Sequence, residues 1–431
     1  MTDVSWRVRG ARRFQRSIIL RVSIAAILTI AALTAATSAS AQDTSPAQPL
    51  TASWQDGFVL QSGDGDYRLN LGLTAQGDGR FTLSDGSPVP DTFSVRKARP
   101  TVSGRIARNF DFKFMADFGN GTPTVLDAYF DVRFSPKFRV RTGKDKTPIG
   151  YEELLGDVFI LFPERAFPSS LVANRDVGVQ AVGDLAGGRV SYSAGMFNGV
   201  PDGASSSTDL DTNSSKDLAG RVVVLPFKSS KARSALRGFG LHIGGSTGRQ
   251  VGALPTFRTS VGQTYFSYAA TSAASGRLYR IAPAVFYYNR AVGAFAEYVR
   301  SSQGVTRSGV ETGIANDAWD ITGSIVLTGE AASERGVRPK APFDPSSGHW
   351  GALQLVARYG RLTVDPLIFT NNLAAAGASS GAAAFTAGAN WYPVSAIKYY
   401  LAFERTAFGA PPNGSKRTTE YTVAFRAQVA F

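Results

Sequence analysis

The sequence has no cysteine and only two histidines, His242 and His349. The first absence excludes disulfides and thiolate chemistry, and the scarcity of histidine leaves little material for metal sites or catalytic relays. Neither histidine lies beside a nucleophile pattern. We therefore expect no enzyme, no metal site and no cofactor.

Long apolar runs are also missing. After residue 40, no window holds the ~18 uninterrupted apolar residues that a membrane-spanning helix needs. Glycine is abundant, with 45 residues, and the chain has 28 phenylalanines and 15 tyrosines. This composition favours strands and turns over helices.

The N-terminus has the order of an export signal: six arginines, an apolar run over 22–36, and the small residues Ala39-Ser40-Ala41. We expect residues 1–41 to be a signal peptide that is cleaved on the way to the outer membrane of a Gram-negative bacterium. A retained membrane anchor is the alternative. Cleavage lowers the net charge from +13 to +8, because this segment carries six arginines and one aspartate. A basic exported chain without cysteine is not expected to bind nucleic acid.

The rest of the chain divides into a polar linker, 42–53, and one long domain, 54–431. Throughout the domain, segments of about ten residues alternate apolar and polar side chains between turn-forming clusters. The period of two predicts an all-β, antiparallel, transmembrane barrel of about 16 strands (16–18). A soluble sandwich would alternate too, but the export signal, the alternation of short turns with long loops and the chain end favour the barrel. The expected strands lie near 67–76, 97–106, 111–118, 126–134, 137–142, 177–185, 188–197, 218–227, 238–247, 279–289, 291–300, 318–328, 350–360, 362–369, 384–392, 397–406 and 421–431.

The chain end carries a further signal. Tyr421, Val423, Phe425, Val429 and Phe431 fall on one face of the last expected strand. A final strand that ends in phenylalanine is common in outer-membrane barrels. We expect this face to meet lipid, and Phe431 to be an assembly signal for the outer-membrane barrel assembly machinery.

The polar faces of the early strands carry many charges, which we expect to line a water-filled lumen. Arginine offers forked donors to oxyanions and lysine a compact charge, so both suit the passage of anions. An alternative is that these charges only pair with one another across strands. The predicted lumen residues are Lys97, Arg99, Arg105, Lys113, Arg133, Lys137, Arg139 and Arg141, opposed by Asp111, Asp117, Asp127 and Asp131.

Several short motifs, in order, resemble the phosphate-selective porin O and P family. They are Phe93–Arg99, Asp111–Asp117, Leu126–Tyr129, Gly143–Glu152, Glu164-Arg165, Gly195–Gly199, Leu327–Glu330, Gly351–Tyr359 and Asn390–Pro393. The resemblance implies a 16-stranded trimeric barrel in outer-membrane lipid and lipopolysaccharide, with an inward-folded loop that narrows the pore. It also implies passive passage of small hydrophilic solutes, with phosphate or polyphosphate among them, and matches Lys113 to a lumen lysine and Asp127 to an adjacent acid.

The segment 150–175 departs from the family pattern. Phosphate-selective members place lysines after the Gly-x-Glu motif, whereas this chain has Glu152, Glu153 and Asp157, and its only bases there are Arg165 and Arg175. We expect these acids to raise the barrier to a divalent anion at the constriction. The sequence therefore predicts a general or weakly anion-preferring pore rather than a tight phosphate channel. An adhesin or structural barrel without significant conductance stays open as the alternative.

Overall fold

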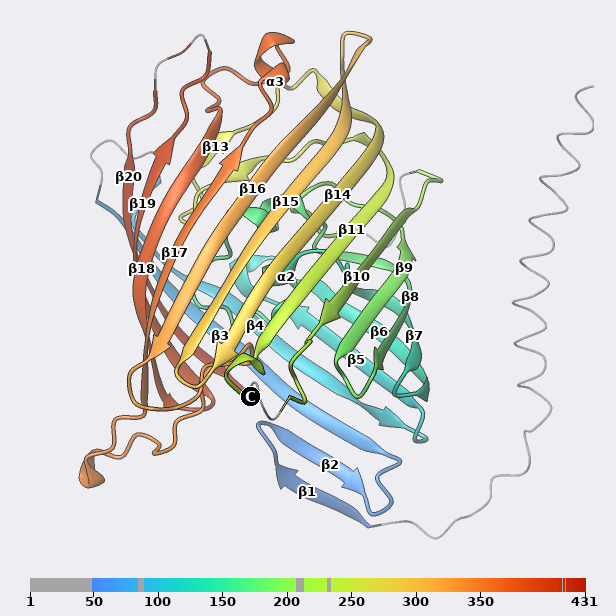
Figure 1. The fold of residues 1–431 in the computed structure, drawn as a ribbon, viewed down its shortest axis with the longest axis vertical. Coiled ribbons are helices and arrows are strands. Elements are labelled where there is room, and N and C mark those ends of the chain that lie inside the picture. The colour runs from blue at the N-terminus through green and yellow to red at the C-terminus, as the bar shows by residue number, and fades with distance from the viewer. Residues whose placement is uncertain (1–48, 84–88, 207–212, 231–233, 413, 415) are drawn as a thin grey trace, which may run out of the picture. The chain divides into compact units, whose positions relative to one another are not determined.

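The computed structural model describes residues 49–83, 89–206, 213–230, 234–412, 414 and 416–431. The predicted signal peptide and most of the predicted linker lie outside these residues. The compact unit Leu50–Phe431 is built almost entirely of antiparallel strands (Figure 1). Within the described residues no helix is both long enough and apolar enough to cross a membrane.

Sixteen strands close on themselves, because each pairs with its neighbours in the chain and β20 pairs with β3. This confirms the predicted antiparallel barrel. The strands are β3 (Arg68–Thr82), β4 (Thr92–Ile106), β5 (Phe110–Asp117), β6 (Thr124–Ser135), β7 (Phe138–Lys146), β8 (Arg175–Leu185), β9 (Val190–Phe197), β10 (Asp217–Val224), β11 (Phe239–Gly252), β14 (Ser272–Asn289), β15 (Val292–Arg307), β16 (Val310–Val326), β17 (Ala352–Thr363), β18 (Gly381–Val394), β19 (Ile397–Phe408) and β20 (Glu420–Ala430).

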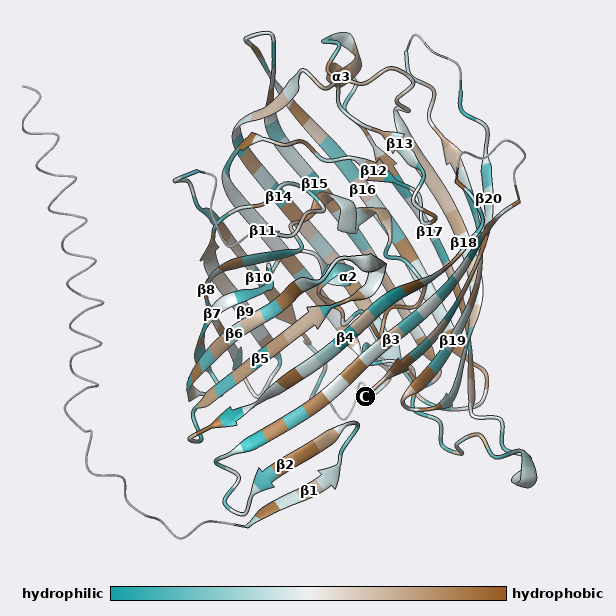
Figure 2. Ribbon diagram, turned by 180° about the vertical axis from the view of Figure 1, so that it is seen from behind, coloured by the Kyte–Doolittle hydropathy of each residue, from teal (hydrophilic) through white to brown (hydrophobic). Residues whose placement is uncertain are grey.

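The period of two places apolar side chains outside and polar side chains inside. On β19, Leu401 and Phe403 are exposed on the outer face, whereas Tyr400 and Glu404 are buried on the inner face. Figure 2 shows hydrophobic and hydrophilic positions alternating along the strands. Closure leaves no strand edge in lipid, where an unpaired backbone group would cost several kcal/mol.

Two smaller hairpins accompany the barrel. Strands β1 (Leu50–Trp54) and β2 (Phe58–Ser62) pair with each other, and β2 extends the sheet beside the first residues of β3. Strand β1 begins inside the predicted linker 42–53, so that prediction extended too far. The second hairpin, β12 (Phe257–Arg258) with β13 (Thr264–Phe266), belongs to the connection between β11 and β14.

The predicted strand over 362–369 is wrong. β17 ends at Thr363, and Leu367–Thr370 forms a one-turn helix, α3. The strand pattern is interrupted at Asp365-Pro366. Proline cannot donate to a strand ladder, and the Asp365 carboxylate accepts a hydrogen bond from the Leu367 N–H at 2.9 Å, which favours a helical turn.

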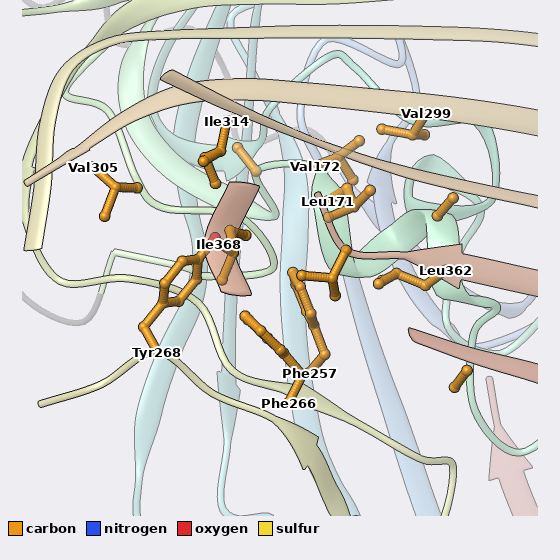
Figure 3. Packing of buried hydrophobic residues seen from close by; sticks show 14 of the residues in the cluster. Leu171, Val172, Phe257, Phe266, Tyr268, Val299, Val305, Ile314, Leu362 and Ile368 are labelled. Carbon is orange, nitrogen blue, oxygen red and sulfur yellow. The ribbon is translucent and has the colours of Figure 1, made fainter. Parts of the chain in front are cut away.

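Part of the inner face is apolar, and other parts of the chain cover it. On β14, Ala282, Ala284 and Phe286 face inward, so this strand is apolar on both faces over residues 281–286. A buried cluster joins such side chains to the connections at the loop end of the barrel, including Leu171, Val172, Phe257 and Phe266 (Figure 3). Burying these groups removes apolar surface from water and fills part of the barrel.

The seam between the first and last barrel strands ends at Phe431. Its backbone exchanges hydrogen bonds with Leu73 at 2.9 and 3.0 Å. Its ring centroid lies 5.3 Å from that of Trp54 and 6.2 Å from that of Phe58. The terminal residue thus joins the hairpin β1–β2 to the closed sheet.

Replacing the terminal ring should weaken this seam. We expect Phe431→Ala to lose two aromatic contacts, at a cost of about 1–3 kcal/mol, and to lower the yield of heat-modifiable barrel in membranes. Phe385→Ala, at an outward position on β18, is the matched control. An unchanged yield for Phe431→Ala would show that the terminal aromatic is incidental to assembly.

Candidate functional site

The connection between β7 and β8, residues 147–174, lies against the inner face of the barrel. Its backbone carbonyls accept hydrogen bonds from inward-facing side chains of four strands, β17 to β20. These bonds run from Lys398 to Ile160 at 2.8 Å, from Asn390 to Leu161 at 3.0 Å, from Gln428 to Val158 at 3.1 Å, from Arg358 to Glu164 at 3.0 Å, and from Arg426 to Pro163. The wall therefore fixes the path of this loop residue by residue.

A buried carboxylate on β15 holds the start of the short helix α2 (Tyr151–Leu154). Glu297 accepts hydrogen bonds from the backbone N–H groups of Tyr151 at 2.6 Å and Glu152 at 3.0 Å. These are two of the N–H groups that a helix start leaves without intrahelical partners. Glu297, a residue of the barrel wall, thus caps the N-terminus of α2.

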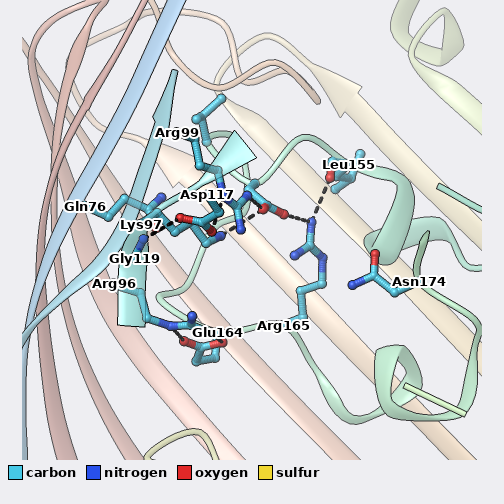
Figure 4. A network of polar contacts seen from close by, with 12 residues as sticks. Gln76, Arg96, Lys97, Arg99, Asp117, Gly119, Leu155, Glu164, Arg165 and Asn174 are labelled. Atoms are coloured by element: carbon cyan, nitrogen blue, oxygen red, sulfur yellow. Dashed lines mark hydrogen bonds and ion pairs between the residues drawn. The ribbon is translucent and has the colours of Figure 1, made fainter. Parts of the chain in front are cut away.

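Asp157 is the centre of an ion network between the loop and β4. Figure 4 shows three bases of this network, Lys97, Arg99 and Arg165. The Asp157 carboxylate lies 2.9 Å from Lys97, 2.5 Å from Arg165 and 3.9 Å from Lys146, and it also pairs with Arg99. Burial by itself raises the pKa of Asp157, but Arg165 and Lys97 outweigh burial and hold that pKa well below its usual range. The Asp157 carboxylate therefore stays ionised at physiological pH.

Glu164 ties the same loop to β3, β4 and β20. It lies 2.5 Å from Arg80, 2.9 Å from Arg96 and 3.4 Å from Arg426. Burial raises the pKa of Glu164, and the three arginines lower it to a net value below its usual range. Arg96 reaches this site because the ladder of β3 with β4 skips one residue there, so that both Arg96 and Lys97 contact the loop.

The loop acids do not form the acidic barrier that the sequence suggested. Glu152 and Glu153 are buried, and so is the Asp157 side chain. Glu152 accepts a hydrogen bond from the Ala166 N–H at 2.6 Å, and Glu153 lies 3.5 Å from Arg165. That expectation is therefore corrected: these carboxylates hold the loop in place, and nearby bases compensate their charge.

The charged wall residues of β4 to β8 largely pair across strands. Lys113 and Arg175 both contact Asp127 at 2.7 Å. Arg175 is the first residue of β8 and therefore belongs to the wall rather than to the loop. Arg141 contacts Asp131 at 2.7 Å, whereas Arg139 lies 3.7 Å from the same carboxylate. The remaining pairs are Arg99 with Asp117 at 2.6 Å, Arg105 with Asp111 at 3.0 Å, and Arg133 with Asp111.

Lys137 stands apart from this wall. It lies in the turn between β6 and β7 and is exposed. Its backbone carbonyl accepts a hydrogen bond from the Tyr192 hydroxyl at 2.9 Å. The structure thus places Lys137 at the rim of the barrel rather than on the strand face.

Open space remains beside this wall. A cavity of about 410 Å³ between the loop and β4–β10 is lined by seven arginines and lysines and by three aspartates. A second cavity, of about 710 Å³ at the end with the short turns, has seven such bases and four aspartates. Lys113, Tyr129, Arg139 and Arg141 line both cavities, so the two hollows adjoin along one basic surface.

Arg221 also lines the first cavity, although the sequence pattern did not single it out. On β10 its neighbours Leu218 and Val222 are exposed on the outer face, and Arg221 is half-buried. Among the described residues it has no ion-pair partner within 4.0 Å. A single arginine in the strand, beside three valines, was the signal that could have identified it.

The two histidines lie on different elements. His242 is buried on the inner face of β11, with its ring 5.9 Å from that of Tyr151. His349 is exposed and precedes β17, and its backbone forms an isolated antiparallel β-bridge with the backbone of Asp344. Within the described ranges, no group of three or more histidine, aspartate or glutamate side chains is arranged to hold a metal ion.

The chain matches one protein family in sequence and several solved structures in fold. The family of phosphate-selective porins O and P matches residues 69–431. No curated protein sequence matches the chain.

Among solved structures, the outer membrane channel DcaP of Acinetobacter baumannii is 12% identical, with a TM-score of 0.56 over 86% of this chain and 99% of that one. OmpF of Salmonella typhi in complex with daunomycin is 12% identical, with a TM-score of 0.53 over 88% and 100%. The trimer form of in-vitro folded OmpT of Vibrio cholerae is 11% identical, with a TM-score of 0.52 over 84% and 99%. At these identities the likeness concerns the fold.

Removing the charge at Asp157 should loosen the loop. Asp157→Asn leaves several buried bases without their shared counter-charge, which we expect to cost about 3 kcal/mol. Limited proteolysis within 147–174 and the noise of single-channel current should both increase. Asp317→Asn is the control, because Asp317 pairs at 3.1 Å with Arg300 in an exposed pair. Equal behaviour of the two variants would contradict the tethering role.

Proposed function

Because the chain belongs to the phosphate-selective porin O and P family and is an outer-membrane porin, we propose that its channel lets small hydrophilic anions diffuse passively. The observation that carries this proposal is the excess of bases in the mid-barrel cavity, seven against three aspartates. Walls of low dielectric focus such a field, which lowers the entry barrier for anions and raises it for cations.

The same wall argues against tight capture of phosphate. Specific capture needs several donors that converge on one oxyanion and displace its water. Here Lys113 and Arg175 share Asp127, and Arg141 donates to Asp131 at 2.7 and 2.8 Å. These donors are already engaged, so a passing anion meets a favourable field without a closed set of free donors. This reason replaces the acidic loop as the cause of weak phosphate binding.

The same proposal includes the membrane location and the assembly of the channel. The exposed apolar positions on the outer face suit contact with outer-membrane lipid and lipopolysaccharide. We further propose delivery by a cleaved signal peptide 1–41, insertion by the barrel assembly machinery, and assembly as a homotrimer. The trimer rests on family membership and on the trimer form of the similar OmpT structure.

Reversing one wall charge should change ion selectivity. In a bilayer with asymmetric chloride, we expect the wild type to give a reversal potential on the anion-selective side. Lys113→Glu should move that potential toward cations, because Lys113 lines both cavities. Lys228→Glu makes the same charge change in an exposed turn and should have little effect. A wild-type protein without any current would instead favour an adhesin or structural barrel.

Phosphate should block the channel only weakly. We expect millimolar phosphate to leave most of the chloride conductance intact, since most of the wall donors already have carboxylate partners. The measurement is single-channel chloride current during a phosphate titration, with sulfate as a second divalent anion. Strong block at micromolar phosphate would reject this proposal in favour of a specific phosphate channel.

A further inference from the structure

A third cavity, which we call the seam cavity, lies where Phe431 ends the seam of the barrel. It has a volume of about 610 Å³ and is lined by the hairpin β1–β2, the loop 147–174, the connection between β16 and β17, and β18 to β20. This volume falls within the range of about 300–1,000 Å³ that is usual for small-molecule sites. Thr74 and Val158 line both the seam cavity and the mid-barrel cavity, so the two adjoin. A solute in the proposed channel therefore reaches the seam cavity from the lumen.

One side of the seam cavity is apolar. Val337 and Tyr392 line it and belong to one buried cluster. Two larger rings stay accessible there, since Phe159 of the loop is 36% exposed and Trp54 of the hairpin is 56% exposed. The ring of Phe431 lies beside that of Trp54. Accessible rings in a concave site lose water when an apolar solute covers them, which favours binding.

The other side of the seam cavity is basic. Its bases are Arg335, Arg338 and Lys398, and the one acidic side chain among the described lining residues is Asp56. Arg338 pairs with Asp56, and the Lys398 ammonium donates to the Ile160 carbonyl at 2.8 Å. Arg335 is exposed, and among the described residues its guanidinium has no ion-pair or hydrogen-bond partner. One base is thus free to meet an anionic group.

We propose that the seam cavity binds small organic anions that combine an apolar ring with one carboxylate, of which arylacetates are the simplest. The ring lies against Phe159 and Trp54. The carboxylate meets Arg335, whose forked donors match its two oxygens. An inorganic anion can use only the charge and an uncharged ring only the apolar side, so the cavity favours a solute that carries both.

The occupant comes from the lumen rather than from the membrane. Lys398 and Gln428 line the seam cavity and belong to the inward-facing side chains that hold the loop. An acyl chain of a surrounding lipid would have to pass the closed sheet to reach this place. The inference deepens the proposed function, because it names a solute class for the same channel, but binding in the cavity does not itself require conduction.

Three matched compounds separate the effect of charge from that of apolar contact. Phenylacetate carries both groups, acetate carries only the carboxylate, and 2-phenylethanol carries only the ring. We expect phenylacetate to reduce the single-channel chloride current at an about tenfold lower concentration than either of the other two compounds. Equal block by phenylacetate and acetate would overturn the proposal.

Two variants each remove one side of the site. Phe159→Ala and Arg335→Gln should each weaken the block by phenylacetate about tenfold and should leave the weak block by phosphate unchanged. Phe403→Ala and Arg249→Gln are the matched controls, because both residues are exposed on outer positions of the barrel. Control variants that lose as much block as the site variants would contradict the assignment of the cavity.

Trp54 provides a second readout that needs no current. In lipid vesicles that contain the protein, phenylacetate should change the tryptophan fluorescence at the concentration that blocks the channel. Trp54→Phe should abolish this change while the block remains. A fluorescence response without any current would overturn conduction and leave the site standing. A conducting channel without a response from Trp54 would overturn the site alone, as expected if a lipid chain already fills the cavity.

Discussion

Hydrogen bonding of the backbone in lipid is the constraint on which the rest of this structure depends. A strand edge left in hydrocarbon would expose N–H and C=O groups with no water to satisfy them. The chain meets this constraint by pairing Thr422–Ala430 of β20 with Thr82–Thr74 of β3, so the sheet has no edge. Closure then fixes which side chains meet lipid and which enclose the lumen, since they alternate along every strand.

The lumen inherits charges that lipid could not accommodate, and most of them are neutralised locally. Asp127 contacts two bases and Asp157 contacts four. Isolated charges in such a partly buried wall would be costly, so pairing stabilises the fold. In the channel that we propose, the remaining imbalance acts on the solute, and Arg221 is one of the side chains that carry it. The same set of wall charges then serves both the stability of the fold and the proposed selectivity.

The barrel interior is asymmetric. The inner faces of β14 to β19 carry apolar groups and polar anchors that the loop 147–174 covers, whereas β3 to β10 keep an open basic surface. Phe286 and Phe295 pack with Tyr151 and Phe162 of that loop. The loop enters from one end and the connection between β16 and β17, residues 327–351, lies at the other, and they meet at Tyr151 and Glu334. In the channel that we propose, the conduction path is therefore displaced toward the wall formed by β3 to β10.

The sequence by itself determined the barrel, because period-two alternation and the run of turns are local properties. It also placed Lys113, Arg139 and Arg141 on the inner face, since facing follows from register within one strand. It could not decide which charges stay free, because partners such as Asp157 and Lys97 lie far apart in the chain. It misjudged Glu153 and Asp157 for the same reason. Whether a carboxylate repels an anion or anchors a loop depends on bases that only closure of the barrel brings beside it.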